Sequence, residues 1–282
     1  MEILQLRYFC DAAEEENFSR TAHKYDVPPS NISQTVHRLE DELGVKLFDR
    51  SPNKISLNEP GRRFYAKVKA ALCTLDDACR EIYDTSDDIQ TEIKLRVCTN
   101  RRIVTVAIEK FKELYPYVNF TLSHSYNDEG DYDLIVSDVT PNEKDLTKEL
   151  LITEKILVAA KKGNVKSGME IKDISSLKGE RFITMNEKSS LCNITEQLCH
   201  KAGFEPNIVI KSEDPYYVRR YIELGLGIAF VPAFSWQGQF SEEIECMDIC
   251  NHTRETYVFY DSKRYMPKAV AKFKDILFEV CR

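Results

Sequence analysis

The chain has 282 residues, of which 43% are hydrophobic and 30% are charged, and its formal net charge is −7. This length suffices for two domains, and the composition is typical of globular proteins rather than of disordered or fibrous ones. No apolar run approaches the length of a membrane span and no signal-peptide core follows the N-terminus, so we expect a cytoplasmic protein without a membrane partner. The nine cysteines are odd in number and scattered, which favours reduced thiols over a disulfide framework or a metal site.

Three helices are expected in the first 44 residues. Residues 2–16 carry apolar side chains near helical spacing, and a second helix is expected over residues 20–24 with Ser19 as its N-cap. The third helix follows two prolines and stops at Gly44, because glycine commonly terminates helices. Its apolar residues recur at intervals of four, three and four and therefore share one face: Ile32, Val36, Leu39 and Leu43.

The opposite face of the third helix is polar and holds no acidic residue before its last turns. Its side chains are of the types that read base edges in the major groove, where glutamine and asparagine pair with adenine and arginine pairs with guanine. Two strand-like pieces, 45–50 and 54–58, form a hairpin wing after it, and their cations suit phosphate contacts. The predicted DNA-binding residues are Ser30, Asn31, Ser33, Gln34, Thr35, His37, Arg38, Arg50 and Lys54.

The charge of this N-terminal region is unusual for a nucleic-acid binder. Residues 1–65 hold nine Lys or Arg against eleven Asp or Glu, whereas a basic domain is the common pattern. Affinity should then depend on few phosphate contacts, and specificity on the third helix.

A long helix is expected from Glu59 to about residue 89. Its apolar residues follow intervals of three or four through Cys79 and Ile82, and no second helix lies beside it in the sequence. Such a stripe is usually buried against a partner chain, although a merely long surface helix is the alternative. The predicted dimer contacts are Phe64, Val68, Leu72 and Leu75.

After residue 91 strands alternate with helices, which is typical of an α/β domain. The expected strands are 93–99, 118–125, 132–138, 155–161, 180–185, 207–212, 228–232 and 255–260. The expected helices are 104–116, 191–203, 215–225 and 267–281.

The ordered set of these segments resembles the LysR-type transcriptional regulators. The N-terminal matches are "LRYFCDAAEEENFSRTA", "RLEDELGVKLFDR" and "ISLNEPGRRFY", and the C-terminal ones are "FKELYPYVNF", "YDLIVSD", "KAGFEPNIV" and "LGLGIAFVP". The resemblance implies an N-terminal winged helix-turn-helix (mainly α), a long linker helix, and an α/β effector domain of two subdomains similar to periplasmic binding proteins, joined by two crossover strands. The implied boundaries are 1–58, 59–91 and 92–282, with subdomain I over 92–154 and 260–282 and subdomain II over 155–259.

The resemblance also implies partners. These are double-stranded promoter DNA, a small-molecule effector held between the subdomains, and further copies of the chain in a dimer or tetramer, without a cofactor. One departure is that Pro28-Pro29-Ser30 replaces the family's common Ser-Gln-Pro, so the third helix loses a hydroxyl N-cap.

The effector contacts that the resemblance implies are Thr99, Asn100, Arg101, Asn186, Ser189, Ser190 and Asp214. The loop that holds the first three runs directly into a helix, whose free N–H groups and dipole favour an anion. Arg101 and Arg102 add two cations, so we expect a small organic anion, unless both arginines face solvent or pair with nearby acids.

Three other functions fit the sequence less well. Catalysis is not expected, because no nucleophile elbow, phosphate-binding glycine loop or paired His-carboxylate motif occurs. A stand-alone small-molecule-binding protein would leave the first 58 residues unexplained. A redox-sensing regulator would use Cys192, near a helix start where the dipole lowers thiol pKa, together with Cys199. Peroxide-sensing members of the family use two cysteines in this region, but the spacing here is shorter.

Overall fold

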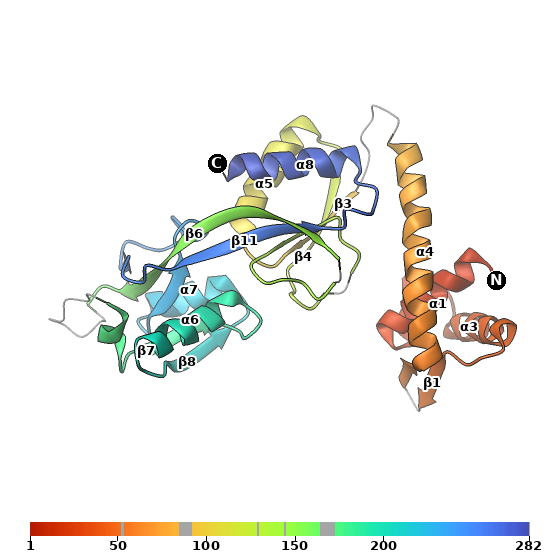
Figure 1. The fold of residues 1–282 in the computed structure, drawn as a ribbon, viewed down its shortest axis with the longest axis horizontal. Helices are drawn as coiled ribbons and strands as arrows, with labels where there is room; N and C mark the ends of the chain where they lie inside the picture. The colour runs from red at the N-terminus through yellow and green to blue at the C-terminus, as the bar shows by residue number, and fades with distance from the viewer. Residues whose placement is uncertain (52–53, 85–91, 129, 144, 164–172, 282) are drawn as a thin grey trace. The chain divides into compact units, whose positions relative to one another are not determined.

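The computed structural model describes residues 1–51, 54–84, 92–128, 130–143, 145–163 and 173–281. The chain divides into two compact units, Met1–Ser86 and Asp87–Arg282, each of which has its own hydrophobic core (Figure 1). Among the described residues, none of the helices has both the length and the hydrophobicity that crossing a bilayer requires.

The first unit is a helical domain with a two-stranded wing. Its elements are α1 (Ile3–Glu15), α2 (Phe18–Lys24), α3 (Pro29–Leu43), β1 (Phe48–Ser51), β2 (Lys54–Leu57) and α4 (Glu59–Tyr83). Strands β1 and β2 pair antiparallel, and the turn expected between them at positions 52–53 lies outside the described residues. Phe9, Ile32 and Leu39 are fully buried where α1 and α3 meet, so the apolar stripes of these helices form the core of the domain.

The ends of the helices follow local side-chain chemistry. The N-cap of α2 is Asn17, whose carboxamide oxygen accepts the N–H groups of Ser19 at 2.8 Å and Arg20 at 3.2 Å, so the prediction of Ser19 as the cap is wrong. As expected, α3 begins after Pro28 without a side-chain cap. It ends at Gly44, whose φ of 69° is a left-handed conformation that glycine adopts without strain.

One position on the apolar face of α3 differs from the prediction. Leu43 is 37% exposed, whereas Glu40 is only 1% exposed. The Glu40 carboxylate accepts the backbone N–H of Leu47 at 2.8 Å and that of Phe48 at 3.3 Å, at the start of the wing. Because a buried carboxylate is stable only when it accepts hydrogen bonds or pairs with a cation, these contacts explain why an acid lies on this face.

Helix α4 packs against its own unit from its start to Leu72. Val68 and Leu72 are 7% and 8% exposed and belong to the core shared with α1, and the ring of Phe64 lies 5.3 Å from that of Phe9. The prediction of Phe64, Val68 and Leu72 as dimer contacts assumes that the apolar stripe of this helix has no partner within its own chain. For these three residues that assumption is wrong, because they pack on the core of the first unit. Leu75, by contrast, is 40% exposed. The helix ends at Tyr83, and the predicted continuation over 85–89 lies outside the described residues.

The second unit is an α/β domain. Its helices are α5 (Arg101–Leu114), α6 (Ser190–Lys201), α7 (Pro215–Glu223) and α8 (Lys268–Val280), with a 3-10 turn η1 (Ile174–Leu177). Its strands are β3 (Glu92–Val97), β4 (Asn119–Ser123), β5 (Leu134–Ser137), β6 (Thr147–Lys161), β7 (Arg181–Met185), β8 (Asn207–Ser212), β9 (Ala229–Pro232), β10 (Ile244–Met247) and β11 (Thr253–Tyr260). The expected strands and helices are confirmed in kind and order, whereas β10, η1 and the first half of β6 were missed.

Strands β6 and β11 connect the two halves of this unit. The main sheet has the order β10-β6-β11-β5-β3-β4, and β9 also pairs with β6. β3 is parallel to β4 and β5, while β11 is antiparallel to both β5 and β6. In Figure 1 the two long strands run side by side from the half that holds α5 and α8 to the half that holds α6 and α7. A second, parallel sheet of β7 and β8 lies in the latter half.

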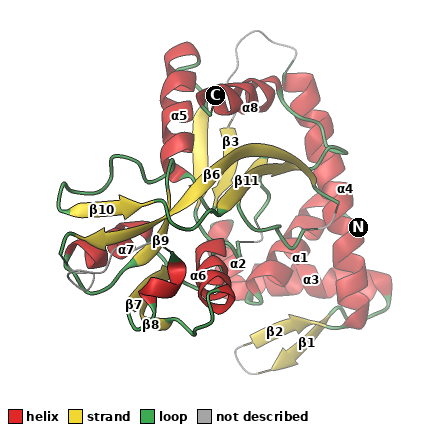
Figure 2. Ribbon diagram, turned by 60° about the vertical axis from the view of Figure 1, so that its left-hand side comes forward, coloured by secondary structure: helices red, strands yellow, loops and turns green. Residues whose placement is uncertain are grey.

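Each half buries its own hydrophobic cluster. One cluster joins β3, β5, α5 and α8 around Phe111 and Phe273, whose rings are 5.6 Å apart. The other joins β7, α6, α7 and β9 around Phe182 and Phe230. Because only the two long strands and nearby loops connect these cores, the unit consists of two subdomains on a shared pair of strands (Figure 2). The predicted fold class is confirmed.

Candidate functional site

The polar face of α3 is open to solvent. Of the nine predicted DNA-binding residues, Ser33 and Thr35 are half-buried and the other seven are exposed. Ser33, Gln34, His37 and Arg38 line a shallow groove on this helix. The Arg38 side chain makes no ion pair with any residue that the structure describes, so its five donors are available to a ligand. The surface therefore has the groups that base recognition requires.

The cations of the wing are already paired with acids. The Arg50 guanidinium lies 3.2 Å from Glu40 and stacks over the ring of Phe18 at 5.6 Å. Lys54 lies 2.8 Å from Glu16. Both side chains remain partly exposed, so they can reach a phosphate only by sharing or exchanging these partners. The first unit thus offers less free positive charge than its count of basic residues suggests.

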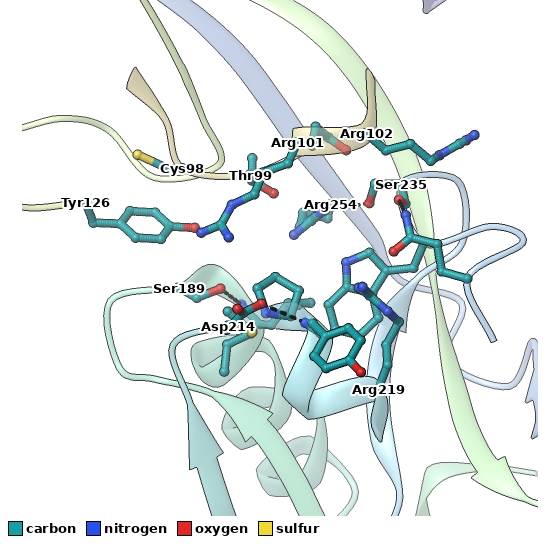
Figure 3. A pocket seen from close by; sticks show the side chains of 17 residues that line it. Cys98, Thr99, Arg101, Arg102, Tyr126, Ser189, Asp214, Arg219, Ser235 and Arg254 are labelled. Atoms are coloured by element: carbon teal, nitrogen blue, oxygen red, sulfur yellow. Dashed lines mark hydrogen bonds between the residues drawn. The ribbon is translucent and has the colours of Figure 1, made fainter. Parts of the chain in front are cut away.

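The second unit holds a cavity of about 120 Å³ between its two subdomains. Figure 3 shows side chains entering it from both walls. One wall contains the start of α5, and the other contains the starts of α6 and α7. Helix N-termini carry unsatisfied N–H groups and positive potential, so their convergence makes this cavity suited to a negatively charged ligand.

The N-terminus of α5 has no side-chain cap. Its N-cap residue, Asn100, has a left-handed backbone with φ 54° and ψ 34°. The Asn100 carboxamide donates to the hydroxyl of Thr256 at 2.7 Å, and no hydrogen bond from its side chain reaches the first turn of the helix. In contrast, Ser189 caps α6 and Asp214 caps α7. The free N–H groups at the start of α5 are therefore the strongest anion-binding feature of the cavity.

Arg254 lines the cavity but is neutralised by two buried carboxylates. Its guanidinium is 2.7 Å from Glu154 and 3.3 Å from Asp138, and it also donates to the hydroxyl of Ser235 at 3.1 Å. Burial disfavours the charged form, but the two carboxylates outweigh it and raise the pKa of Arg254 above its usual value. Asp138 also accepts the hydroxyl of Tyr126 at 2.8 Å. This network holds the strands and loops that form the back of the cavity.

Three further arginines line the cavity, and they differ in direction. Arg102 points away in Figure 3 and donates to the carbonyl of Phe234 at 3.1 Å. Arg101 extends into the cavity toward Tyr126, and its buried Nε has no hydrogen-bond partner. Arg219 stacks over Trp236 at 5.1 Å, and burial lowers its pKa. Neither Arg101 nor Arg219 makes an ion pair with a described residue.

The cavity brings together five of the seven predicted effector contacts: Thr99, Asn100, Arg101, Ser189 and Asp214. It does not include Asn186, which donates to Glu213 at 3.0 Å, or Ser190, which donates to Asp138. For these two residues the structure contradicts a place in the lining, because their side chains are turned to other partners.

Sequence reasoning missed several lining residues. They include Arg219, Arg254, Tyr126, Trp236, Ser235 and Gln239. For Arg254 no signal existed, because it lies just before the expected strand 255–260 in a polar stretch, where a charged residue is usually exposed. For Arg219 no signal existed, because a second arginine follows it directly on the same helix and local pattern does not distinguish them.

The two cysteines of the redox alternative are both buried on α6. Burial raises the pKa of the Cys192 thiol and raises that of Cys199 to about 12, so the expected lowering at the helix start is wrong. Seven residues of helix place their Cα atoms roughly 10 Å apart, whereas a disulfide needs about 4.4–6.8 Å. A bond between them would therefore require α6 to unwind.

A helix-turn-helix unit joined to a two-subdomain unit with a ligand-sized cavity defines a DNA-binding regulator with an effector-binding domain. Comparisons agree. A family model described as "LysR substrate binding domain" matches residues 93–282, and one described as "Bacterial regulatory helix-turn-helix protein, lysR family" matches residues 3–62. The transcriptional dual regulator GltC of Bacillus subtilis is 31% identical over 242 residues, which cover 82% of this chain and 81% of that protein. The chain belongs to the LysR family of transcriptional regulators.

Solved structures show the same fold. A full-length OxyR variant from Pseudomonas aeruginosa matches with a TM-score of 0.72 at 19% identity. The match covers 100% of this chain and 95% of the OxyR chain. Full-length CbnR, a LysR family transcriptional regulator, was solved in complex with its target DNA and matches with a TM-score of 0.64 at 18% identity. The match covers 99% of this chain and 100% of the CbnR chain.

Proposed function

We propose that the protein acts in the cytoplasm as a dimer or tetramer that binds promoter DNA through α3 and responds to a small organic anion in the cavity of the second unit. The observation that carries the effector class is the uncapped start of α5 with Arg101 extending into the cavity beside it. Backbone N–H groups and an arginine fork are the donors that a carboxylate binds best.

The DNA-binding role rests on the exposed face of α3. Gln34 and Asn31 are exposed and can pair with an adenine, and Arg38 is free to pair with a guanine. Arg50 and Lys54 of the wing are the proposed phosphate contacts, weakened by their acid partners. The expected result is a binder whose sequence preference is strong relative to its non-specific affinity.

The effector acts through the two subdomains. A ligand shifts an equilibrium between two arrangements only if it binds one of them more tightly. Because the cavity has one wall on each subdomain, an anion that contacts both walls favours the arrangement in which the walls are close. That change in the effector domain is the proposed signal to the DNA-binding unit.

Screening small carboxylates by thermal shift tests this function. We expect at least one to stabilise the wild-type protein, and we expect Arg101→Ala to lose most of that stabilisation, since ligand that binds the native state raises its stability. Lys110→Ala is the matched control, because Lys110 is an exposed cation on the same helix outside the cavity. The effector assignment fails if no carboxylate stabilises the wild type or if Arg101→Ala responds identically.

No observation favours the alternatives. The thiols of Cys192 and Cys199 are buried, with raised pKa values. A stand-alone binding protein does not account for the helix-turn-helix unit, and the relatives are regulators of transcription rather than enzymes.

A further inference from the structure

We propose that the effector is a dianion, a single small molecule with two anionic groups, one held by Arg101 and the start of α5 and the other by Arg219. This inference rests on the proposed function and deepens it, because it assigns the number and placement of the charges on the effector.

The charge balance inside the cavity supports two anionic groups. Of the four lining arginines, Arg254 is neutralised by buried carboxylates and Arg102 turns away to a backbone carbonyl. Arg101 and Arg219 remain without an ion pair among the described residues. A partly buried guanidinium without an ion-pair partner loses solvation. For Arg219 the nearby carboxylates of Asp214 and Glu223 do not offset that loss, since burial lowers its pKa in spite of them. Two such groups in one cavity are each expected to find their counter-ion on the ligand.

The two arginines lie on opposite walls. Figure 3 shows Arg101 entering from the wall that carries α5 and Arg219 rising from the wall that carries α7. The ring of Trp236 holds the Arg219 guanidinium in place by stacking, at 5.1 Å. A single carboxylate can pair with the arginine of one wall, whereas two anionic groups on one molecule can pair with the arginines of both walls.

Asp214 is the acidic side chain of the lining, and its charge is partly offset. Its carboxylate accepts the N–H of Tyr216 at 2.8 Å as the N-cap of α7, where the helix dipole favours a negative charge. It repels an anion placed directly beside it. The anionic groups of the effector should therefore lie at the two arginines rather than at the start of α7.

The cavity admits only a short spacer between the charges. Its volume is about 120 Å³, and an apolar cavity of roughly 150 Å³ accepts a molecule the size of benzene. Met185, Leu191 and Trp236 supply apolar lining that fits a short hydrocarbon chain. Short dicarboxylates and phosphorylated carboxylates both have this chemistry.

A dianion also explains how binding alters the domain. Because its two charges contact both subdomains, its affinity depends on their separation, so it selects one arrangement. A monoanion held by Arg101 alone binds both arrangements similarly and shifts nothing. A dianion should therefore change operator binding, and a matched monoanion should not.

The test is calorimetric titration of the full-length protein with matched pairs. The dianions are succinate, glutarate and adipate, the monoanions of equal chain length are butyrate, pentanoate and hexanoate, and phosphoglycolate represents the phosphorylated class. We expect the best dianion to bind at least about tenfold more tightly than the monoanion of equal chain length, as one added charge-assisted contact provides. If a dicarboxylate binds best, the second anionic group of the effector is a carboxylate. If phosphoglycolate binds best, it is a phosphate.

Variants separate the two subsites. Arg219→Gln should weaken the dianion by about tenfold and leave the monoanion within about twofold, whereas Arg101→Gln should weaken both. Arg219→Lys keeps the charge without the fork and should give an intermediate affinity. Arg220→Gln is the control, because Arg220 neighbours Arg219 but is exposed, pairs with Glu223 at 3.0 Å and lies outside the cavity.

The outcomes are distinguishable. If monoanions bind as tightly as dianions, or if Arg219→Gln weakens both classes equally, the dianion proposal is overturned and the organic-anion function stands. If neither class binds the wild-type protein, both are overturned. Circular dichroism of each variant confirms folding. If Arg219→Gln is unfolded, Arg219→Lys replaces it, and if Arg101→Gln is unfolded, Arg101→Lys replaces it.

Discussion

At the scale of single residues, the partners of a charge decide its role. Glu40 lies on the apolar face of α3 because it accepts two backbone N–H groups of the wing and pairs with Arg50. Arg38, one helical turn from Gln34, has no such partner among the described residues. Free and paired cations on one small domain therefore contribute differently to DNA binding.

Gln34→Ala should relax sequence preference. A glutamine that pairs with a base edge contributes about 1–3 kcal/mol of discrimination, so the loss should appear on the operator and not on scrambled DNA. Gln197→Ala, an exposed glutamine on α6 of the other unit, is the control. Fluorescence anisotropy on both sequences measures the effect, and equal losses on the two would contradict base reading.

Arg50→Ala should act differently, because a phosphate contact carries no sequence information. We expect similar weakening on operator and scrambled DNA and a decrease of about one in the slope of log affinity against log salt. The effect should be modest, since Arg50 is shared with Glu40 before DNA arrives. If Arg50→Ala loses affinity for the operator alone, Arg50 contacts a base rather than a phosphate.

At the scale of elements, α4 changes its surroundings along its length. The part of the helix up to Leu72, which is 8% exposed, packs on α1 within one unit, whereas Leu75 is 40% and Ile82 is 69% exposed. Exposed large apolar side chains on one helix indicate an interface that a single chain does not complete. We therefore place the proposed dimer contacts in the part of the helix from Leu75 onward.

Leu75→Glu should produce folded monomers that no longer bind the operator tightly, because two half-sites require two linked domains. Leu72→Glu should instead unfold the first unit, since it buries a carboxylate without a partner in its core. Light scattering gives the mass, and circular dichroism reports folding. A dimer of unchanged mass for Leu75→Glu contradicts the interface.

At the scale of the whole molecule, the cores of the two units are separate. Phe9 belongs to the core of the first unit and Phe273 to that of the second. The two clusters of the second unit belong to one compact unit and share strands β6 and β11, so we expect one cooperative transition for each unit. A ligand of the cavity then stabilises only the transition of the second unit.

Scanning calorimetry of the full chain should show this division. Phe9→Leu should lower the temperature of one transition and Phe273→Leu that of the other, because each leaves a cavity in one core. A saturating effector should raise only the transition that Phe273→Leu lowers. A single transition that both variants shift would show that the units unfold together.

Much of the fold could be predicted from local sequence signals. The apolar spacing of α3, the glycine that ends it and the alternation of strands and helices after residue 91 depend on neighbouring residues, and they are confirmed. The start of β6 was missed because residues 147–154 lie where two subdomains share a strand, and their burial depends on β11 about a hundred residues later. Five residues that line the cavity could be predicted, because they lie in loops that lead into helices and the starts of helices can be recognised in the sequence.

The sequence by itself determined the helix-turn-helix and the alternation of strands and helices, because each depends on residues within a few turns of one another. Only the tertiary structure decided which arginine is free. Arg254 pairs with Asp138 and Glu154, which lie 116 and 100 positions away in the chain, whereas Arg219 stacks on the ring of Trp236 and makes no ion pair with a described residue. A charge is neutralised by whatever the fold brings within about 4 Å of it, and local pattern has no information about that distance.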